Sequence, residues 1–366
     1  MTGLPPRSRV EVDLAAIRAN VGALARLAGR AEVLAVVKAD GYGHGAVPSG
    51  RAALDGGATR LCVATLAEAL ELRAALGPAV PVVVLSPLRP GEEPDAAGLE
   101  IVLSSREGFE RLRDAGVRCA VHVKVDTGMG RWGLAPDEGL AVGRAIAAGE
   151  APGLSLAGLA SHLATADEPD RAFLAEQTRR FREVAAAFPA CPRHLANSAA
   201  TLRAPDALFD AVRTGIAIYG VSPFGTDPAE DGLRPAMRWT SHVAQLRSLA
   251  AGGSSGYGRR LVASGPTRVA LVPVGYADGY PRLLSGRADV LIGGRRRRVA
   301  ATVSMDQLTA VVDDDVRAGD EVVLLGRQGD EQVAAEELAM RAETIGWDVV
   351  CRVGNRPQRG ERIAAG

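Results

Sequence analysis

The first two-thirds of the chain alternates between short apolar runs and longer amphipathic segments. Residues 13–28 carry apolar side chains at Leu14, Ile17, Val21, Leu24 and Leu27, a spacing that predicts a helix. Stretches rich in Ala, Glu and Arg predict further helices, as at 66–76 and 171–188. Eight apolar runs lie between such segments and are interpreted as strands: 33–37, 61–64, 80–85, 101–103, 121–125, 156–163, 194–196 and 211–213. Strands that alternate with helices in this way predict a (β/α)8 barrel, which we place at residues 10–235.

The pattern changes in the last third of the chain. From Trp239 onward, short apolar runs are separated by Gly and Asp, at 243–249, 269–274, 290–292, 299–303, 308–312 and 322–325. Only residues 331–343 have a helical pattern there. We therefore predict a smaller, β-rich C-terminal domain at 236–366, with residues 1–9 packing on it. A linker that contains prolines and glycines is expected at 222–235.

Composition excludes several classes of protein. The 366 residues include 43 basic and 43 acidic ones, so the net charge is zero and nucleic-acid binding is not expected. The basic run at 295–298 is interpreted as a solvated turn. No segment approaches the ~20 apolar residues of a membrane span, and residues 1–10 contain no secretory signal. Widely spaced cysteines predict reduced core thiols and a cytoplasmic location without a metal site; they are Cys62, Cys119, Cys191 and Cys351.

The basic residues are almost all arginine, since Lys38 and Lys124 are the only two lysines among the 43. A coding bias explains this, and so does chemistry, because a buried lysine can act as a neutral amine whereas a guanidinium stays protonated. Composition leaves both explanations open. Lys38 follows the first predicted barrel strand, where active sites of such barrels lie, and glycines follow at 41, 43 and 45. A lysine that extends from a loop into solvent is the alternative.

A phosphate site is predicted on the same rim of the barrel. The loops after the last two predicted strands contain Asn197-Ser198 and Gly215-Ile216, and N–H groups at a helix start favour a phosphate. Simple helix capping by Ser198 is the alternative. A lysine able to form a Schiff base, together with a phosphate site, indicates pyridoxal phosphate (PLP).

Arg213 ends the last predicted barrel strand, near where the ring of such a cofactor would lie. A guanidinium only donates hydrogen bonds, so a ring nitrogen beside it stays unprotonated. That arrangement favours simple loss and return of a Cα proton over transamination. The alternative for Arg213 is a surface ion pair.

Lys124 and Tyr257 each have a purely structural interpretation, and Tyr257 also has a catalytic one. Lys124 and Asp126 share a strand face, and a buried ion pair is the simplest interpretation. Tyr257, in the glycine-flanked segment 254–259, is a candidate general base. Free tyrosine titrates near ~10, so it would need a cationic neighbour to act at neutral pH. A packing or turn role is the alternative for Tyr257.

Taken together, these segments resemble the bacterial alanine racemase family. The resemblance runs in the family's order over almost the whole chain, through 37–45, 124–131, 161–167, 196–198, 213–216, 275–279 and 304–307. It implies a PLP-binding barrel followed by a β domain. It also implies a homodimeric isomerase that interconverts L- and D-alanine for peptidoglycan, with each active site completed by the partner's β domain.

The resemblance further implies how the proton is moved. Lys38 would bind the cofactor covalently and then act as the base on one face of the substrate. The partner's Tyr257 would be the base on the other face, because inversion needs removal of a proton from one side and its return from behind. His162 would bridge Tyr257 and Arg213 as a cationic relay.

Binding residues follow from the same resemblance. Arg131 and the partner's Met305 would position the substrate carboxylate, with Tyr276 and Asp306 in the adjoining motifs. Lys124 corresponds to a lysine that is often carbamylated in the family, and the added charge would fix Arg131. The phosphate would be held by Tyr42, Asn197, Ser198, Gly215 and Ile216.

The chain departs from the family pattern near its end and at one other site. Residues 356–359 keep two arginines but no tyrosine follows them, which predicts weaker cofactor retention and altered substrate choice. Ser304 stands where many relatives have cysteine, with little expected effect. Three alternatives remain open: a racemase of another small amino acid such as serine, a non-catalytic PLP-binding protein, and a PLP decarboxylase, against which Arg213 argues.

Overall fold

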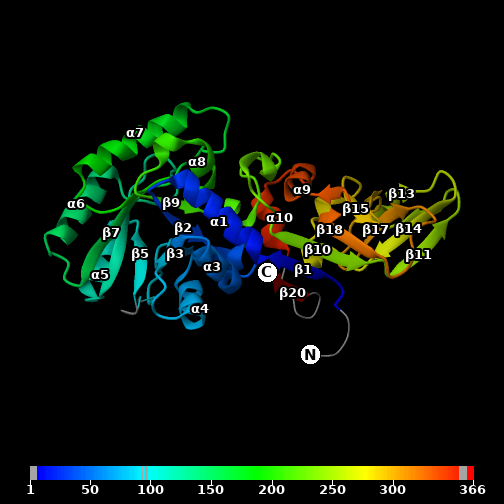
Figure 1. Cartoon of the computed structure of the whole chain (residues 1–366), viewed down its shortest axis with the longest axis horizontal. Helices are drawn as coiled ribbons and strands as arrows, with labels where there is room; N and C mark the ends of the chain where they lie inside the picture. The colour runs from blue at the N-terminus through cyan, green and yellow to red at the C-terminus, as the bar shows by residue number, and fades with distance from the viewer. Residues whose placement is uncertain (1–5, 93, 95–97, 354–360) are drawn as a thin grey trace. The chain divides into compact units, whose positions relative to one another are not determined.

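The computed structural model describes residues 6–92, 94, 98–353 and 361–366, and these divide into two compact units (Figure 1). The barrel unit comprises Ile17–Phe224 and Asp231–Leu233. The β unit comprises the described parts of Met1–Ala16, Gly225–Glu230 and Arg234–Gly366. The predicted linker is therefore divided between the two units.

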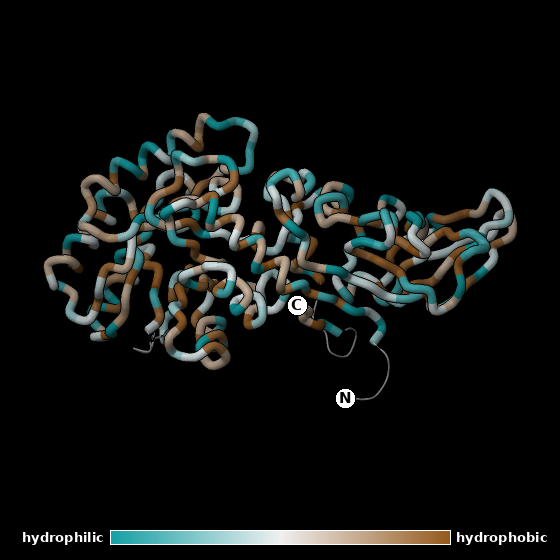
Figure 2. Tube along the Cα trace, viewed as in Figure 1, coloured by the Kyte–Doolittle hydropathy of each residue, from teal (hydrophilic) through white to brown (hydrophobic). Residues whose placement is uncertain are grey.

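The barrel unit contains a closed barrel of eight parallel strands, as the sequence predicts. Strand β2 pairs with both β3 and β9, which closes the ring in chain order. The strands are β2 (Glu32–Val36), β3 (Ala58–Val63), β4 (Val82–Val84), β5 (Leu99–Leu103), β6 (Cys119–Lys124), β7 (Leu154–Ala160), β8 (Arg193–His194) and β9 (Ala211–Thr214). Figure 2 shows hydrophobic residues along these inner strands, whereas the outer helix α7 (Ala172–Ala187) carries both hydrophilic and hydrophobic residues.

Helices connect the barrel strands, and several begin at a capping side chain. Thr65 and Glu68 form a reciprocal capping box at α4, and Ser105 accepts a hydrogen bond from the Gly108 N–H at α5. The helices are α1 (Leu14–Ala28), α2 (Lys38–Tyr42), α3 (Ala46–Asp55), α4 (Leu66–Leu76), α5 (Arg106–Asp114), α6 (Pro136–Ala147), α7 (Ala172–Ala187) and α8 (Ser198–Arg203), with 3-10 turns η1 (Pro205–Ala207), η2 (Ile216–Tyr219) and η3 (Pro228–Asp231). None of the helices described is long and apolar enough to cross a membrane.

The β unit is built from a seven-stranded sheet, a three-stranded sheet and a short hairpin. The large sheet has the order β16-β15-β18-β10-β1-β20, with β19 beside β18. Its strands are β1 (Arg9–Asp13), β10 (Met237–His242), β15 (Asp289–Ile292), β16 (Arg295–Arg298), β18 (Glu321–Gln328), β19 (Glu331–Val333) and β20 (Glu361–Ala365). Strand β1 pairs with β10, so residues 10–13, which the sequence analysis places with the barrel, lie in this sheet.

The remaining elements of the β unit are shorter. The three-stranded sheet contains β11 (Gln245–Leu249), β14 (Thr267–Val272) and β17 (Leu308–Val312), and the hairpin contains β12 (Ser254–Ser255) and β13 (Leu261–Val262). Helical segments are η4 (Tyr257–Arg259), η5 (Tyr276–Asp278), η6 (Arg282–Leu284), α9 (Ala335–Arg341) and α10 (Gly346–Arg352). The helix predicted at 331–343 corresponds to α9, but its first residues form strand β19, and the second helix, α10, was not predicted. The predicted strand at 299–303 is reduced to a bridge between Val299 and Ala310.

The arginine run 295–298 is strand β16 and not a solvated turn. The turn lies one step earlier, at Gly293 and Gly294, which have φ of 63° and 73°. Arg297 is the buried residue of this strand, and its guanidinium pairs with Asp313 and Asp315 at 2.5 and 2.7 Å. The sequence did not predict this strand, because four identical charged residues show no alternation of apolar and polar positions.

The cysteines follow the prediction only in part. Cys62 and Cys119 are buried, Cys191 is half-buried and Cys351 is exposed.

Candidate active site

Lys38 begins a left-handed turn that is separated from strand β2 by Val37 alone. Ala39, Asp40 and Tyr42 have φ of 52°, 52° and 51°, a conformation that costs a non-glycine residue ~1–2 kcal/mol. Contacts on both sides hold the turn: the Ala39 N–H donates to Glu68 at 2.7 Å, and the Asp40 carboxylate accepts the Ala46 N–H at 2.9 Å. Backbone strain maintained by surrounding contacts is a common property of functional sites.

A buried tyrosine supports this turn from within the barrel unit. The ring of Tyr219 stacks on His44 at 4.4 Å between centroids and packs against Tyr42 at 5.2 Å. Its hydroxyl donates to the Val36 carbonyl at 3.1 Å. Nδ1 of His44 lies 3.0 Å from the Tyr42 carbonyl, a contact in which the imidazole donates. Tyr219 therefore ties the end of β2 to the residues that follow Lys38.

Neutral hydrogen-bond donors meet beside Tyr42, at the predicted phosphate site. The Ser198 hydroxyl accepts the N–H groups of Gly215 and Ala217 at 2.9 and 3.3 Å. A Cβ at Gly215 would lie 2.6 Å from the Tyr42 hydroxyl, so glycine is required for this approach. Hydroxyl and backbone N–H groups in this arrangement suit a phosphate, so the residues present fit the phosphate of PLP.

Asn197 has a different role in this structure. Its side chain accepts the Ala200 N–H at 3.0 Å and caps helix α8. The capping role considered for Ser198 therefore belongs to its neighbour.

The guanidinium of Arg213 is buried and makes four hydrogen bonds. It donates to Nδ1 and the carbonyl of His194 at 2.6 and 3.0 Å, to the Ser161 carbonyl at 2.6 Å and to Nδ1 of His162 at 3.2 Å. The surface ion pair considered for this residue is therefore excluded. Burial lowers the pKa of Arg213 to about 10, which leaves it protonated at neutral pH.

From Arg213, a chain of hydrogen bonds with one direction crosses the barrel interior. Because a guanidinium has no acceptor, Nδ1 of His194 accepts and its Nε2 carries the hydrogen. Nε2 of His194 then donates to Nδ1 of His122 at 2.9 Å, and Nε2 of His122 donates to the Glu100 carboxylate at 2.7 Å. Arg60 pairs with the same carboxylate at 3.1 Å. Although burial opposes ionisation of Glu100, these partners hold its pKa below the usual value.

His162, which accepts a hydrogen bond from Arg213, lies in a cationic environment. Burial, and then the charges of Arg213, Arg131, Lys124 and Lys38, lower its pKa well below the usual value. His162 is therefore neutral at neutral pH, and the positive charge of the expected relay belongs to Arg213. Four cations acting on one point also make this region suited to an anionic ligand.

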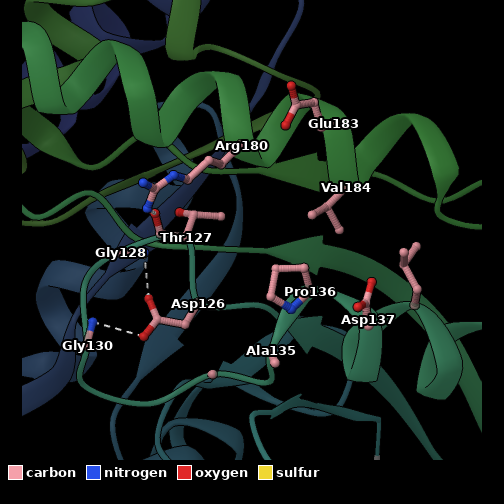
Figure 3. A pocket seen from close by; sticks show the side chains of 12 residues that line it. Asp126, Thr127, Gly128, Gly130, Ala135, Pro136, Asp137, Arg180, Glu183 and Val184 are labelled. Carbon is pink, nitrogen blue, oxygen red and sulfur yellow. Dashed lines mark hydrogen bonds between the residues drawn. The ribbon is translucent and has the colours of Figure 1, made fainter.

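Lys124 and Asp126 do not behave as a simple ion pair, because each has partners of its own. The Lys124 ammonium donates to the Trp132 carbonyl. The Asp126 carboxylate accepts the N–H groups of Gly128, Met129 and Gly130 at 2.8, 2.8 and 2.9 Å, and so organises the loop that carries Arg131 (Figure 3). Burial, with help from Arg213 and Arg131, lowers the pKa of Lys124 to about 8.

The remaining predicted residues lie in the β unit, close to the segment 302–306. Thr302 donates its hydroxyl hydrogen to the Tyr257 carbonyl at 2.8 Å, and the Tyr276 N–H donates to the Ser304 carbonyl at 3.0 Å. The side chains of Tyr257, Tyr276 and Met305 are 74%, 43% and 52% exposed. The Asp306 carbonyl accepts a hydrogen bond from Arg7 at 2.8 Å. The structure thus gathers these four residues on one unit and the other site residues on the barrel unit.

A parallel barrel whose mouth offers a strained lysine turn, a phosphate cradle and a buried arginine defines a barrel of the PLP-binding class. The family model described as "Alanine racemase, N-terminal domain" matches residues 12–223, and "Alanine racemase, C-terminal domain" matches residues 236–360. The chain belongs to the alanine racemase family.

Individual relatives span the whole chain. It is 43% identical over 362 residues to an alanine racemase of Symbiobacterium thermophilum, covering 95% of each chain. The alanine racemase of D-cycloserine-producing Streptomyces lavendulae matches with a TM-score of 0.92 and 39% identity over 99% of this chain and 98% of that one. The alanine racemase of Bartonella henselae, with covalently bound pyridoxal phosphate, matches with a TM-score of 0.86 and 28% identity over 99% and 100%.

Sequence reasoning missed the buried chain of Glu100, His122 and His194, and also Tyr219. One signal was present for His122, which stands two residues before Lys124 in β6 and so shares its inward face. His194 stands in a strand of two residues, too short for any alternation to be visible.

Proposed function

We propose that this protein is a PLP-dependent isomerase that interconverts L- and D-alanine. The observation that carries the proposal is full-length similarity to alanine racemases, combined with the lysine turn and the four cations around His162. When bound, the cofactor delocalises the electron pair left when the Cα proton departs.

The barrel unit would hold the cofactor. Lys38 would bind it covalently, and Arg213 would donate to its ring nitrogen. The phosphate would be held by Tyr42, Ser198 and the N–H groups of Gly215 and Ile216. A rearrangement of the Ser198–Gly215 contact would accompany phosphate binding, because that N–H now donates to the hydroxyl. Asn197 would support this site indirectly, through its cap on α8.

Two bases would act on opposite faces of the substrate: Lys38 and the partner's Tyr257. Since Nδ1 of His162 accepts from Arg213, its Nε2 carries a hydrogen that can be donated to the phenolate. Arg213 would supply the positive charge, and His162 would transmit it as a neutral donor. This hydrogen bond would stabilise the charged form of the tyrosine.

A homodimer with shared sites would explain why large side chains on the β unit are exposed. Tyr257, Tyr276 and Met305 present apolar or aromatic surface that a second copy of this chain would cover. Met305 of the partner subunit and Arg131 would bind the substrate carboxylate, with Tyr276 and Asp306 nearby. We place the activity in the cytoplasm, where D-alanine enters peptidoglycan precursors.

Lys124 is proposed to be carbamylated. Its lowered pKa, about 8, makes a neutral amine accessible near neutral pH, and that amine is the form that reacts with carbon dioxide. A carbamate there would attract Arg131 by a charge-assisted contact.

Chiral chromatography after incubation with a panel of L-amino acids tests the proposal. Alanine is expected to have the highest kcat/KM. Reactions that start from L-alanine and from D-alanine are both expected to end with equal amounts of the two enantiomers. Faster racemisation of serine would favour the alternative substrate. Cofactor absorbance without any racemisation would favour the non-catalytic alternative, and carbon dioxide release would indicate a decarboxylase.

The altered C-terminal segment, 356–359, lies outside the described residues. The proposal that it weakens cofactor retention is tested by the PLP dissociation constant. If that constant equals the value for a racemase that keeps the tyrosine, the segment has no such effect.

A further inference from the structure

Backbone hydrogen bonds fix the loop that carries Arg131, whereas the Arg131 side chain is oriented by its contact with a neighbouring side chain. Asp126 accepts three N–H groups of the loop, and the Asp126 N–H donates to the Leu134 carbonyl at 2.9 Å. Gly133 has φ of 145°, and a Cβ at this position would lie 2.8 Å from the Asp126 nitrogen. The two parts of the loop therefore approach more closely than any other residue would allow. The loop backbone therefore has little freedom, and the direction of the exposed Arg131 guanidinium depends on what its side chain contacts.

That contact is the ring of Trp132. The guanidinium carbon of Arg131 lies 4.8 Å from the centroid of the indole. The Lys124 ammonium lies 5.6 Å from the same centroid and donates to the Trp132 carbonyl. Among the residues that the structure describes, no carboxylate forms an ion pair with Arg131. With Lys124 unmodified, one aromatic ring thus contacts two cations that repel each other, because an indole face attracts positive charge without carrying a negative one.

We propose that Trp132 is a positioning residue, which holds the Arg131 guanidinium in the orientation that receives the substrate carboxylate. This inference rests on the proposed role of Arg131. An uncharged π face suits this task for an electrostatic reason. The indole attracts the guanidinium through its π face and leaves the N–H groups of Arg131 available to the substrate carboxylate. While Lys124 is unmodified, the ring also offsets part of the repulsion between Arg131 and Lys124, and a carbamate on Lys124 would act on Arg131 in addition to the ring.

The test compares Trp132→Phe, which keeps an aromatic face, with Trp132→Leu, which keeps apolar bulk without one. Propionate serves as the carboxylate probe, measured as a competitive inhibitor of the holoenzyme. For W132L, the propionate inhibition constant and the KM for L-alanine are expected to rise together by roughly 2- to 5-fold, the range for loss of one exposed cation–π contact. The kcat is expected to change by less than about twofold, and W132F is expected to keep both binding constants near those of wild type.

Two results would overturn the proposal. One is an unchanged propionate constant in W132L, and the other is an equal loss in W132F and W132L, which would show that the ring acts by its bulk. Cofactor absorbance and circular dichroism of each variant establish that the barrel is intact. Arg131→Gln separates this inference from the proposed function: if it leaves propionate inhibition unchanged, the role of Arg131 itself is wrong. If it weakens inhibition while W132L does not, only the role of Trp132 fails.

Discussion

Arg213 donates a hydrogen bond of 2.6 Å to Nδ1 of His194, and this contact sets the direction of every later hydrogen bond in the barrel interior. The donor has no acceptor to offer, so the tautomers of His194 and His122 follow from it, and the chain ends at Glu100. The buried guanidinium is thereby connected to a carboxylate through two imidazole rings. Polar networks of this kind stabilise a protein only while every member keeps its partner.

The hydrogen bonds that run from Arg213 to Glu100 predict that the fold is sensitive to acid. Burial and the neighbouring charge of Arg213 hold the pKa of His194 well below the usual value, so the folded state keeps it neutral. Below about pH 6.5 the unfolded chain binds a proton that the native state does not, so the free energy of unfolding falls by up to about 1.4 kcal/mol per pH unit for this histidine. His162 adds a loss of the same sign, and the lowered pKa of Glu100 adds another below about pH 4.5.

Urea unfolding followed by circular dichroism between pH 7.5 and 5.5 measures this effect. His194→Asn keeps an acceptor for Arg213 but has no titrating group, so its stability is expected to fall less steeply with acid. His242→Asn is the matched control, because His242 lies in strand β10 and takes no part in the hydrogen bonds from Arg213 to Glu100 that are described above. The free energy of unfolding of H242N is expected to depend on pH with the wild-type slope. An equal slope for H194N and wild type would show that His194 does not contribute.

Replacement of Lys38 tests the covalent attachment of the cofactor. Lys38→Arg keeps the positive charge but cannot form the bond, so it is expected to lose the visible absorbance of the lysine-bound cofactor as completely as Lys38→Ala. Racemisation is expected to fall by roughly three orders of magnitude or more. Lys124→Arg is the control from the only other lysine and is expected to keep the band. Retention of the band in K38R would contradict the assignment.

Tyr257→Phe tests the second base. Loss of the phenol is expected to lower kcat by roughly 10²–10⁴-fold and to leave cofactor absorbance unchanged. In heavy water, exchange of the Cα proton without inversion is expected to persist for the one enantiomer that Lys38 serves. Equal loss of exchange for both enantiomers would argue against bases on opposite faces.

Mixing inactive chains tests whether the site is shared between subunits. In a mixed dimer of K38A and Y257F chains, one site combines an intact Lys38 with the partner's intact Tyr257. Random pairing is expected to restore about one quarter of wild-type activity, because half of the dimers are mixed and each has one working site. If both bases came from the same chain, every site would lack one of them, and no activity would return.

Tyr219 is predicted to support both stability and cofactor retention. Tyr219→Phe removes the hydrogen bond to the Val36 carbonyl and is expected to cost about 1 kcal/mol. Tyr219→Ala also removes the packing on Tyr42 and His44 and is expected to cost about 3–5 kcal/mol. Urea unfolding gives these energies, and the PLP dissociation constant is expected to rise in the alanine variant only. A normal constant in Y219A would mean that Tyr42 does not need this support.

Carbamylation of Lys124 is predicted to appear near neutral pH. With a pKa of about 8, roughly one tenth of the amine is neutral at pH 7 and half at pH 8. A ¹³C carbamate resonance is expected with labelled bicarbonate, rising over this interval at constant dissolved carbon dioxide and absent in K124R. A signal that persists in K124R would assign the modification to another amine.

The local pattern of apolar and polar residues is sufficient to predict the eight barrel strands and the position of Lys38. Each strand is an apolar run between polar segments, and the lysine simply follows the first of them, so local pattern was sufficient. The meeting of Ser198 with Gly215 was predictable for a related reason, because the ends of parallel strands meet on one rim whatever the details of packing.

The identity of the polar residues that meet inside the barrel, and the sheet that each strand joins, depend on long-range contacts of the folded chain. Glu100, His122, His194 and Arg213 stand on four strands, and their contacts exist only once the barrel closes. The membership of β1 in the C-terminal sheet likewise depends on pairing with β10, more than 220 residues away. Local periodicity records which face of an element is buried, but the partner across that face is chosen by closure and packing of the whole chain.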